Sequence, residues 1–143
     1  MPRVERNIEI KALQSNIFKI LDDTSISPTW NLAVIAVEKI AEEEFQIQST
    51  VGDFTAKRTE TIENESISIK IIGGIFNNMG YVLKSKGEVV EATIWGEFDD
   101  EKNEKVLAKA GEMLLESLKR YAEFLEQGGN PDEYDKKQIT VSA

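Results

Sequence analysis

Residues 101–126, EKNEKVLAKAGEMLLESLKRYAEFLE, decide how the rest of the chain can fold. Apolar side chains recur in this stretch at spacings of three and four residues, the period of one face of an α-helix. They are Leu107, Ala110, Leu114, Leu118, Tyr121 and Leu125. Acidic residues crowd the start of the stretch, where they suit the helix dipole, and Gly128-Gly129 ends it. We therefore predict one long amphipathic helix, whose apolar face needs another element to cover it.

The region before this helix predicts six strands. We expect them at residues 33–40, 44–51, 54–62, 66–72, 79–86 and 88–98. Apolar and polar residues alternate within them, as in SISIKII of residues 66–72, and period two is typical of a half-buried strand. Turn-like pairs such as Gly52-Asp53 and Lys86-Gly87 separate the strands. Short strands joined by short turns indicate an antiparallel meander.

The N-terminal part adds one strand and two short helices. Residues 4–10, VERNIEI, alternate as a strand, although Arg6 interrupts the apolar side. Residues 13–22 have helical spacing, and Pro28 near the start of residues 27–30 suits a second helix. The order is strand, two helices, six strands and a long helix, in a single domain. A strongly twisted sheet that wraps the last helix would leave a cavity between them.

The composition restricts the function classes. The chain has 143 residues, with 17 basic and 26 acidic side chains, a net charge of −9, and neither His nor Cys. This acidity argues against nucleic acid or an anionic membrane as partner. Without Cys and His there are no disulfides, no thiolate or imidazole metal ligands and no Ser-His triad. The start, MPRVERNIEI, lacks an apolar leader, so we expect a cytoplasmic protein without stable membrane insertion.

Residues 8–30 carry a resemblance to a known family. The chain has an apolar strand end, then a small residue, an Ile-Phe pair, Leu, Asp and a Pro-x-Trp. These are Ile8, Ile10, Ala12, Ile17, Phe18, Leu21, Asp22 or Asp23, Pro28 and Trp30. In this pattern the chain resembles the START-like, or Bet v 1-like, superfamily (SRPBCC, polyketide cyclase/dehydrase and lipid transport). It departs from the family at Leu13, where Pro is usual, and at Ser15, where Glu is common.

The resemblance implies an α+β helix-grip fold. In it a curved antiparallel sheet of about seven strands wraps around the long C-terminal helix, with two short helices after the first strand. We expect a START-like domain over residues 1–128 and a polar, loosely packed tail over 129–143, in which Ile139 and Val141 could dock.

The resemblance also implies a ligand class. Members of the superfamily hold apolar or amphipathic small molecules between sheet and last helix, and they include lipid and steroid carriers, aromatic cyclases and co-chaperone domains. We therefore expect a binder of a hydrophobic small molecule. The alternatives are a cyclase or dehydratase acting on a polyketide-like or aromatic substrate, and a protein-interaction module. The superfamily shares no catalytic residues, and we expect no cofactor and no metal.

Trp30 and Arg58 are the first two candidate ligand-binding residues. Trp30 could form a wall for a flat ligand, or it could be a core aromatic that closes the first helix pair. Arg58 and Glu60 fall on the same side of their strand as Phe54, Ala56 and Ile62. If that side faces the cavity, they could hold the polar end of a ligand. Otherwise the strand runs to an edge of the sheet where both faces are exposed to solvent, or the two residues are paired across strands.

Tyr81, Glu91 and Trp95 are the next candidates. A buried Tyr81 hydroxyl and a desolvated Glu91 could act together as acid and base, with the pKa of Glu91 raised by burial. Glu91 shares its strand face with Trp95. The alternative is that Tyr81 and Trp95 pack while Glu91 faces solvent.

The long helix supplies Ala110, Gly111 and Leu114. A glycine in the middle of a helix destabilises it by up to about 1 kcal/mol relative to alanine, so its presence needs a reason. Gly111 and Ala110 could form a small-residue patch that leaves room for a ligand. Alternatively Gly111 could allow close packing against a bulky sheet residue such as Trp95.

Overall fold

The computed structural model describes residues 2–50 and 52–136. The strands are β1 (Arg3–Ile10), β2 (Val34–Ala41), β3 (Glu44–Ser49), β4 (Phe54–Ile62), β5 (Ser66–Ile72), β6 (Asn78–Lys86) and β7 (Val89–Glu97). The α-helices are α1 (Gln14–Asp22), α2 (Ser27–Trp30) and α3 (Glu104–Glu126), and short 3-10 helices lie at Thr24–Ile26, Glu101–Asn103 and Pro131–Glu133. Each predicted element is present, and the long helix starts with a 3-10 turn.

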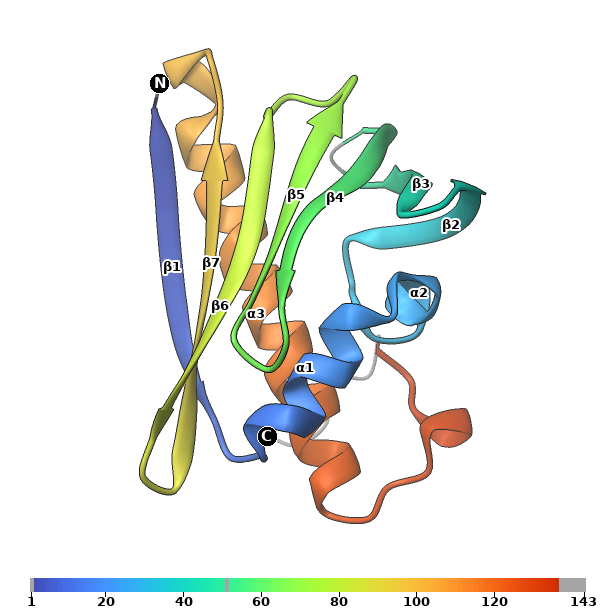
Figure 1. Cartoon of the computed structure of the whole chain (residues 1–143), viewed down its shortest axis with the longest axis vertical. Coiled ribbons are helices and arrows are strands. Elements are labelled where there is room, and N and C mark those ends of the chain that lie inside the picture. Colours follow the sequence, from blue (N-terminus) through green and yellow to red (C-terminus); the bar gives the residue numbers. More distant parts are fainter. Residues whose placement is uncertain (1, 51, 137–143) are drawn as a thin grey trace.

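The strands form one antiparallel sheet in the order β1-β7-β6-β5-β4-β3-β2. The first strand thus pairs with the last, and β2 to β7 follow one another as a meander. Figure 1 shows α3 running along the β1 and β7 side, while β2 and β3 curl away from the plane of the other strands. The predicted α+β helix-grip architecture is confirmed.

The core lies between α3 and the inner face of the sheet. Alternate residues of β6 and β7 point toward the helix, among them Leu83, Ala92 and Ile94, and all three are buried. On α3, Leu115 and Leu118 meet them and are 2% and 0% exposed. The helix packs on β1 and β7 and makes few contacts with the far half of the sheet. This off-centre position leaves room under the curled strands.

No α-helix in the described part of the chain is long and apolar enough to cross a membrane.

Residues 129–136 pack against the domain more closely than the expected loose tail. The Tyr134 ring lies 4.9 Å from the Tyr121 ring and 5.0 Å from the Phe124 ring, centroid to centroid. The Nζ of Lys136 donates to the carbonyls of Asn31, at 3.0 Å, and Val34, at 2.7 Å. Aromatic side chains on the last turns of α3 therefore hold this segment. The predicted docking residues Ile139 and Val141 lie outside the described residues.

Two carboxylates near the end of α3 hold the connection between β1 and α1. Glu123 accepts the backbone N–H of Lys11 at 2.9 Å, and Glu126 accepts that of Leu13 at 3.0 Å. The Nζ of Lys119 also donates to Glu123, at 2.8 Å. These bonds join the N-terminal segment to the helix that covers its strand.

We expect Glu123 to make the stability of the protein sensitive to acid. Burial raises the pKa of this carboxyl, but its bonds to Lys11 and Lys119 and their charges outweigh burial and lower the pKa below 4.5. Such a carboxylate stabilises the fold above its unfolded pKa, and the contribution is lost as the pH falls through the folded value. Glu123→Gln should lower the free energy of unfolding at neutral pH by up to about 1 kcal/mol, because solvent screens partly exposed pairs.

Urea unfolding at a series of pH values checks this expectation. The difference between wild type and Glu123→Gln should shrink as the pH falls below about 4.5. Glu88→Gln, on the exposed turn between β6 and β7, is the control and should change little at any pH. A difference that stays constant down to pH 3 would contradict the assigned role of Glu123.

Candidate functional site

A cavity of about 130 Å³ lies between the first half of α3 and the inner face of the sheet. One wall comes from Leu107, Ala108, Ala110, Gly111 and Leu114 of α3. The opposite wall comes from Phe45, Ile47, Phe54, Ala56, Ile69, Ile71, Met79, Tyr81 and Ile94 of the sheet. The lining is mostly apolar. The cavity exists because α3 rests on β1 and β7 while the other strands bend around the space beside it.

Seven of the eight predicted binding residues border this cavity. They are Trp30, Arg58, Tyr81, Trp95, Ala110, Gly111 and Leu114. Glu91 is not among the lining residues. Among the described residues no group of three Asp or Glu side chains is placed to hold a metal ion.

Trp30 and Tyr81 are buried aromatic residues of the lining that carry a hydrogen-bond donor. Trp30 is 2% exposed, and among the described residues its indole N–H has no hydrogen-bond partner. Tyr81 is 7% exposed, and burial raises the pKa of its hydroxyl, so the group stays protonated at neutral pH. Both residues can therefore donate a hydrogen bond where few acceptors are present.

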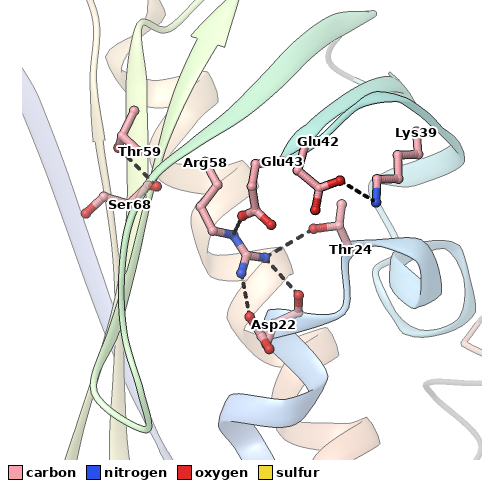
Figure 2. A network of polar contacts seen from close by, with 8 residues as sticks. All are labelled: Asp22, Thr24, Lys39, Glu42, Glu43, Arg58, Thr59 and Ser68. Carbon is pink, nitrogen blue, oxygen red and sulfur yellow. Dashed lines mark hydrogen bonds and ion pairs between the residues drawn. The ribbon is translucent and has the colours of Figure 1, made fainter.

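Arg58 reaches the cavity but is already paired. Its guanidinium donates to the side chain of Asp22, to the Asp22 carbonyl at 2.8 Å and to the Thr24 hydroxyl at 3.4 Å. The Glu43 carboxylate lies 3.6 Å from its Nε. Figure 2 shows these groups converging on Arg58 from the end of α1 and from the turn between β2 and β3. The side chain thus joins three parts of the fold at one end of the cavity.

Glu60 does not share the inner face with Arg58, which corrects the prediction from the sequence. The pairing of β4 with β5 shifts by one residue between Arg58 and Glu60, as in a β-bulge. The Thr59 hydroxyl donates to the Ser68 carbonyl at this point, at 3.1 Å (Figure 2). The shift turns Glu60 to the outer face opposite Ser68, and Glu60 is exposed.

Glu91 and Tyr81 lie on opposite faces of the sheet, so the predicted acid–base pair is wrong. Tyr81 pairs across strands with Ile94, and both side chains are buried toward α3, as is that of Ala92. Glu91 belongs to the alternate set of β7 and therefore points to the outer face. There its carboxylate accepts from the Nζ of Lys86 at 2.9 Å. The alternative in which Glu91 stays out of the cavity is the one that the structure supports.

Trp95 borders the cavity, yet its ring covers the outer face. It pairs across strands with Gly80, and a Cβ atom on Gly80 would lie 2.6 Å from the indole. Arg3 stacks on this ring with its Cζ 4.5 Å from the centroid. Only a glycine at position 80 lets the indole lie flat on the sheet. The side chain is thereby directed away from the space under α3.

Both explanations considered for Gly111, room for a ligand and close packing against the sheet, apply in the structure. It lines the cavity, and a Cβ atom there would lie 3.3 Å from Cγ2 of Ile94. The bulky neighbour is therefore Ile94 rather than Trp95. Because Gly111 has no side chain, α3 can approach the sheet closely at one edge of the cavity.

Sequence reasoning did not select Arg6 and Asn31, which also line the cavity. The Nε of Arg6 donates to Glu112 of α3 at 3.1 Å, so this charge is paired as well. A charged residue on the apolar side of a strand was the signal that could have found Arg6. Asn31 follows the Pro-x-Trp turn and is 5% exposed, and nothing in its sequence position marks it as buried.

Comparison with protein-family models finds no match, and no curated protein matches in sequence. Solved structures do match. Protein XoxI from Bacillus cereus has a TM-score of 0.77 at 13% identity, over 88% of this chain and 99% of that one. A START superfamily protein from Mycobacterium smegmatis has a TM-score of 0.67 at 15% identity, over 86% and 98%. The di-domain ARO/CYC StfQ of the steffimycin biosynthetic pathway has a TM-score of 0.65 at 13% identity, over 85% of this chain and 50% of that one.

Proposed function

Because this chain has the helix-grip fold of START-like proteins, we propose that it binds a small apolar molecule in the cavity beside α3. The observation that carries the proposal is the apolar lining contributed by both the helix and the curled strands. Binding sites for small molecules typically combine apolar walls with a few polar groups. Trp30, Tyr81 and Asn31 are such groups here.

The volume limits the size of the occupant. About 130 Å³ is well below the roughly 300–1,000 Å³ of pockets that hold drug-sized ligands. It is close to the engineered cavity of about 150 Å³ that binds benzene in another protein. The occupant is therefore about one ring in size. A molecule of several fused rings would require α3 to move away from the sheet.

An enzymatic role has less support from the geometry. The one acid–base pair that the sequence offered, Tyr81 with Glu91, is divided between the two faces of the sheet. The di-domain ARO/CYC StfQ shares the fold at 13% identity, a level at which fold does not carry function. We therefore propose binding and assign no catalytic residue.

Titration with α-methylstyrene, a one-ring hydrocarbon, tests the proposal. We expect saturable binding near one molecule per chain, measured by calorimetry or by NMR shifts of residues around Leu114. The variant Ala110→Leu places a larger side chain in the cavity and should weaken binding at least about tenfold, since it occupies the ligand's space. Its melting temperature should stay the same or rise.

Ala36→Leu is the matched control, because Ala36 is exposed on β2 and does not line the cavity. It should bind α-methylstyrene as the wild type does. A folded wild-type protein without a saturable site would exclude the proposed function. Unchanged binding in Ala110→Leu would place the site elsewhere on the protein.

A further inference from the structure

One buried donor of the lining is the indole N–H of Trp30. The side chain is 2% exposed and lines the cavity, and its N–H has no acceptor among the described residues. Buried donors in folded proteins are nearly always paired, because an unpaired one loses its bonds to water without replacement. A cavity beside such a donor can hold the missing acceptor.

Two further uncharged side chains of the lining can also donate a hydrogen bond. The Tyr81 hydroxyl is held in its protonated form by burial. Asn31 uses its side-chain oxygen to accept the N–H of Ala33 at 2.9 Å, which leaves its amide NH₂ to donate elsewhere. The Trp30 N–H, the Tyr81 hydroxyl and the Asn31 amide can thus all donate, and a ligand with an acceptor atom would complement them.

The charges around the cavity disfavour an anionic ligand. Two guanidinium groups reach the lining, and each is already paired, Arg6 with Glu112 and Arg58 with Asp22 and Glu43. A ligand carboxylate beside either guanidinium would also lie near the carboxylate already paired there, and elsewhere in the lining it would be unpaired in apolar surroundings. Burial of an unpaired charge is strongly unfavourable.

From these contacts we propose that the ligand is an uncharged, one-ring molecule whose acceptor atom, a carbonyl oxygen in the simplest case, receives the Trp30 N–H. The proposal rests on the proposed function, since it assigns the chemistry of the molecule held in the same cavity. It makes Trp30 the residue that distinguishes a ketone or aldehyde from a hydrocarbon of the same shape.

Three compounds with equal numbers of non-hydrogen atoms test the proposal: acetophenone, α-methylstyrene and benzoate. Acetophenone has a carbonyl group, α-methylstyrene has a C=CH₂ group in its place, and benzoate has a carboxylate. The dissociation constant of each is measured by calorimetry for the wild type, for Trp30→Phe and for Tyr134→Phe. Tyr134 is an aromatic residue outside the cavity lining and serves as the control.

The informative quantity is the affinity for acetophenone divided by that for α-methylstyrene. This ratio removes changes in cavity volume, which affect both compounds alike. We expect Trp30→Phe to lower the ratio about three- to tenfold, the usual effect of one hydrogen bond. Tyr134→Phe should leave the ratio unchanged, and benzoate should show no saturable binding to the wild type.

The indole N–H resonances give a test that uses the wild type alone and needs no variant. The wild type has two tryptophans. In ¹H–¹⁵N NMR spectra, one indole N–H resonance should move downfield with acetophenone and should move far less with α-methylstyrene. An N–H that a bound water already satisfies would respond alike to both compounds, and this result would overturn the proposal.

The remaining outcomes separate the two proposals. If both neutral compounds bind but Trp30→Phe leaves their ratio unchanged, the role of Trp30 is wrong and the cavity still binds ligands. Binding of benzoate as tight as that of acetophenone would overturn the uncharged ligand alone. If none of the three compounds binds a folded wild type, the proposed function fails and the ligand assignment fails with it.

Discussion

A chain that ends at Asp100 will not fold cooperatively. The deletion removes residues 101–143 and with them α3, which covers the inner face of β1 and β7. Its Leu115 and Leu118 are 2% and 0% exposed. Burial of each such side chain contributes about 1.5–3 kcal/mol, against a total stability of about 5–15 kcal/mol for a small domain. Loss of several of them exceeds the stability of the whole protein.

Thermal melting followed by circular dichroism tests this expectation. Residues 1–100 should aggregate or show no cooperative transition. A chain of residues 1–128 is the control. It keeps α3 and loses, among the described contacts, the packing of Tyr134 on α3 and the bonds of Lys136 to two backbone carbonyls, so it should still melt cooperatively at a lower temperature. A soluble, cooperatively melting fragment of residues 1–100 would mean that α3 is peripheral to the core.

Truncation of Leu118 will lower the free energy of unfolding more than truncation of Leu114, one helical turn away. Leu118 is fully buried in the core, whereas Leu114 is half-buried and borders the cavity. Leu118→Ala should cost about 2–5 kcal/mol, because it opens a new void in packed surroundings. Leu114→Ala should cost less, since its methyl groups have fewer neighbours to lose.

The same pair of variants separates stability from binding. Leu114→Ala enlarges the existing cavity, so it should accept larger ring compounds than the wild type, for example naphthalene. Leu118→Ala should leave the preferred ligand size unchanged. Urea unfolding gives the stabilities, and calorimetry gives the ligand sizes. Two results would contradict the placement of the cavity along α3. One is an equal loss of stability in both variants, and the other is binding of larger ring compounds by Leu118→Ala but not by Leu114→Ala.

Local patterns were sufficient to predict the secondary structure. The alternation of Ile67, Ile69 and Ile71 with polar neighbours predicted β5 with the boundaries it has. The apolar stripe from Leu107 to Leu125 predicted α3, because side chains three and four residues apart share a helix face whatever lies beside them. The order of these elements, with the resemblance of residues 8–30, predicted the helix-grip fold.

Strand faces were predicted less well, for a physical reason. In β7 both alternate sets contain apolar residues, Ala92 and Ile94 on one side and Trp95 on the other, so period two does not say which set is buried. Contact with α3 decides this. In β4 the irregularity after Arg58 reverses the alternation, and Glu60 turns outward. A bulge is set by pairing with the neighbouring strand, which the residues of β4 alone do not specify.

The amino-acid sequence by itself determined the elements, their order, the acidic surface and the absence of thiol and imidazole chemistry. These follow from composition and from spacing along one chain, which are local properties. Tertiary structure alone decided that α3 rests to one side of the sheet and that Arg6 and Arg58 are paired. It also decided that the Trp30 N–H has no acceptor within residues 2–50 and 52–136. A cavity is the space left when elements distant in sequence pack, and its size and polarity depend on their relative positions.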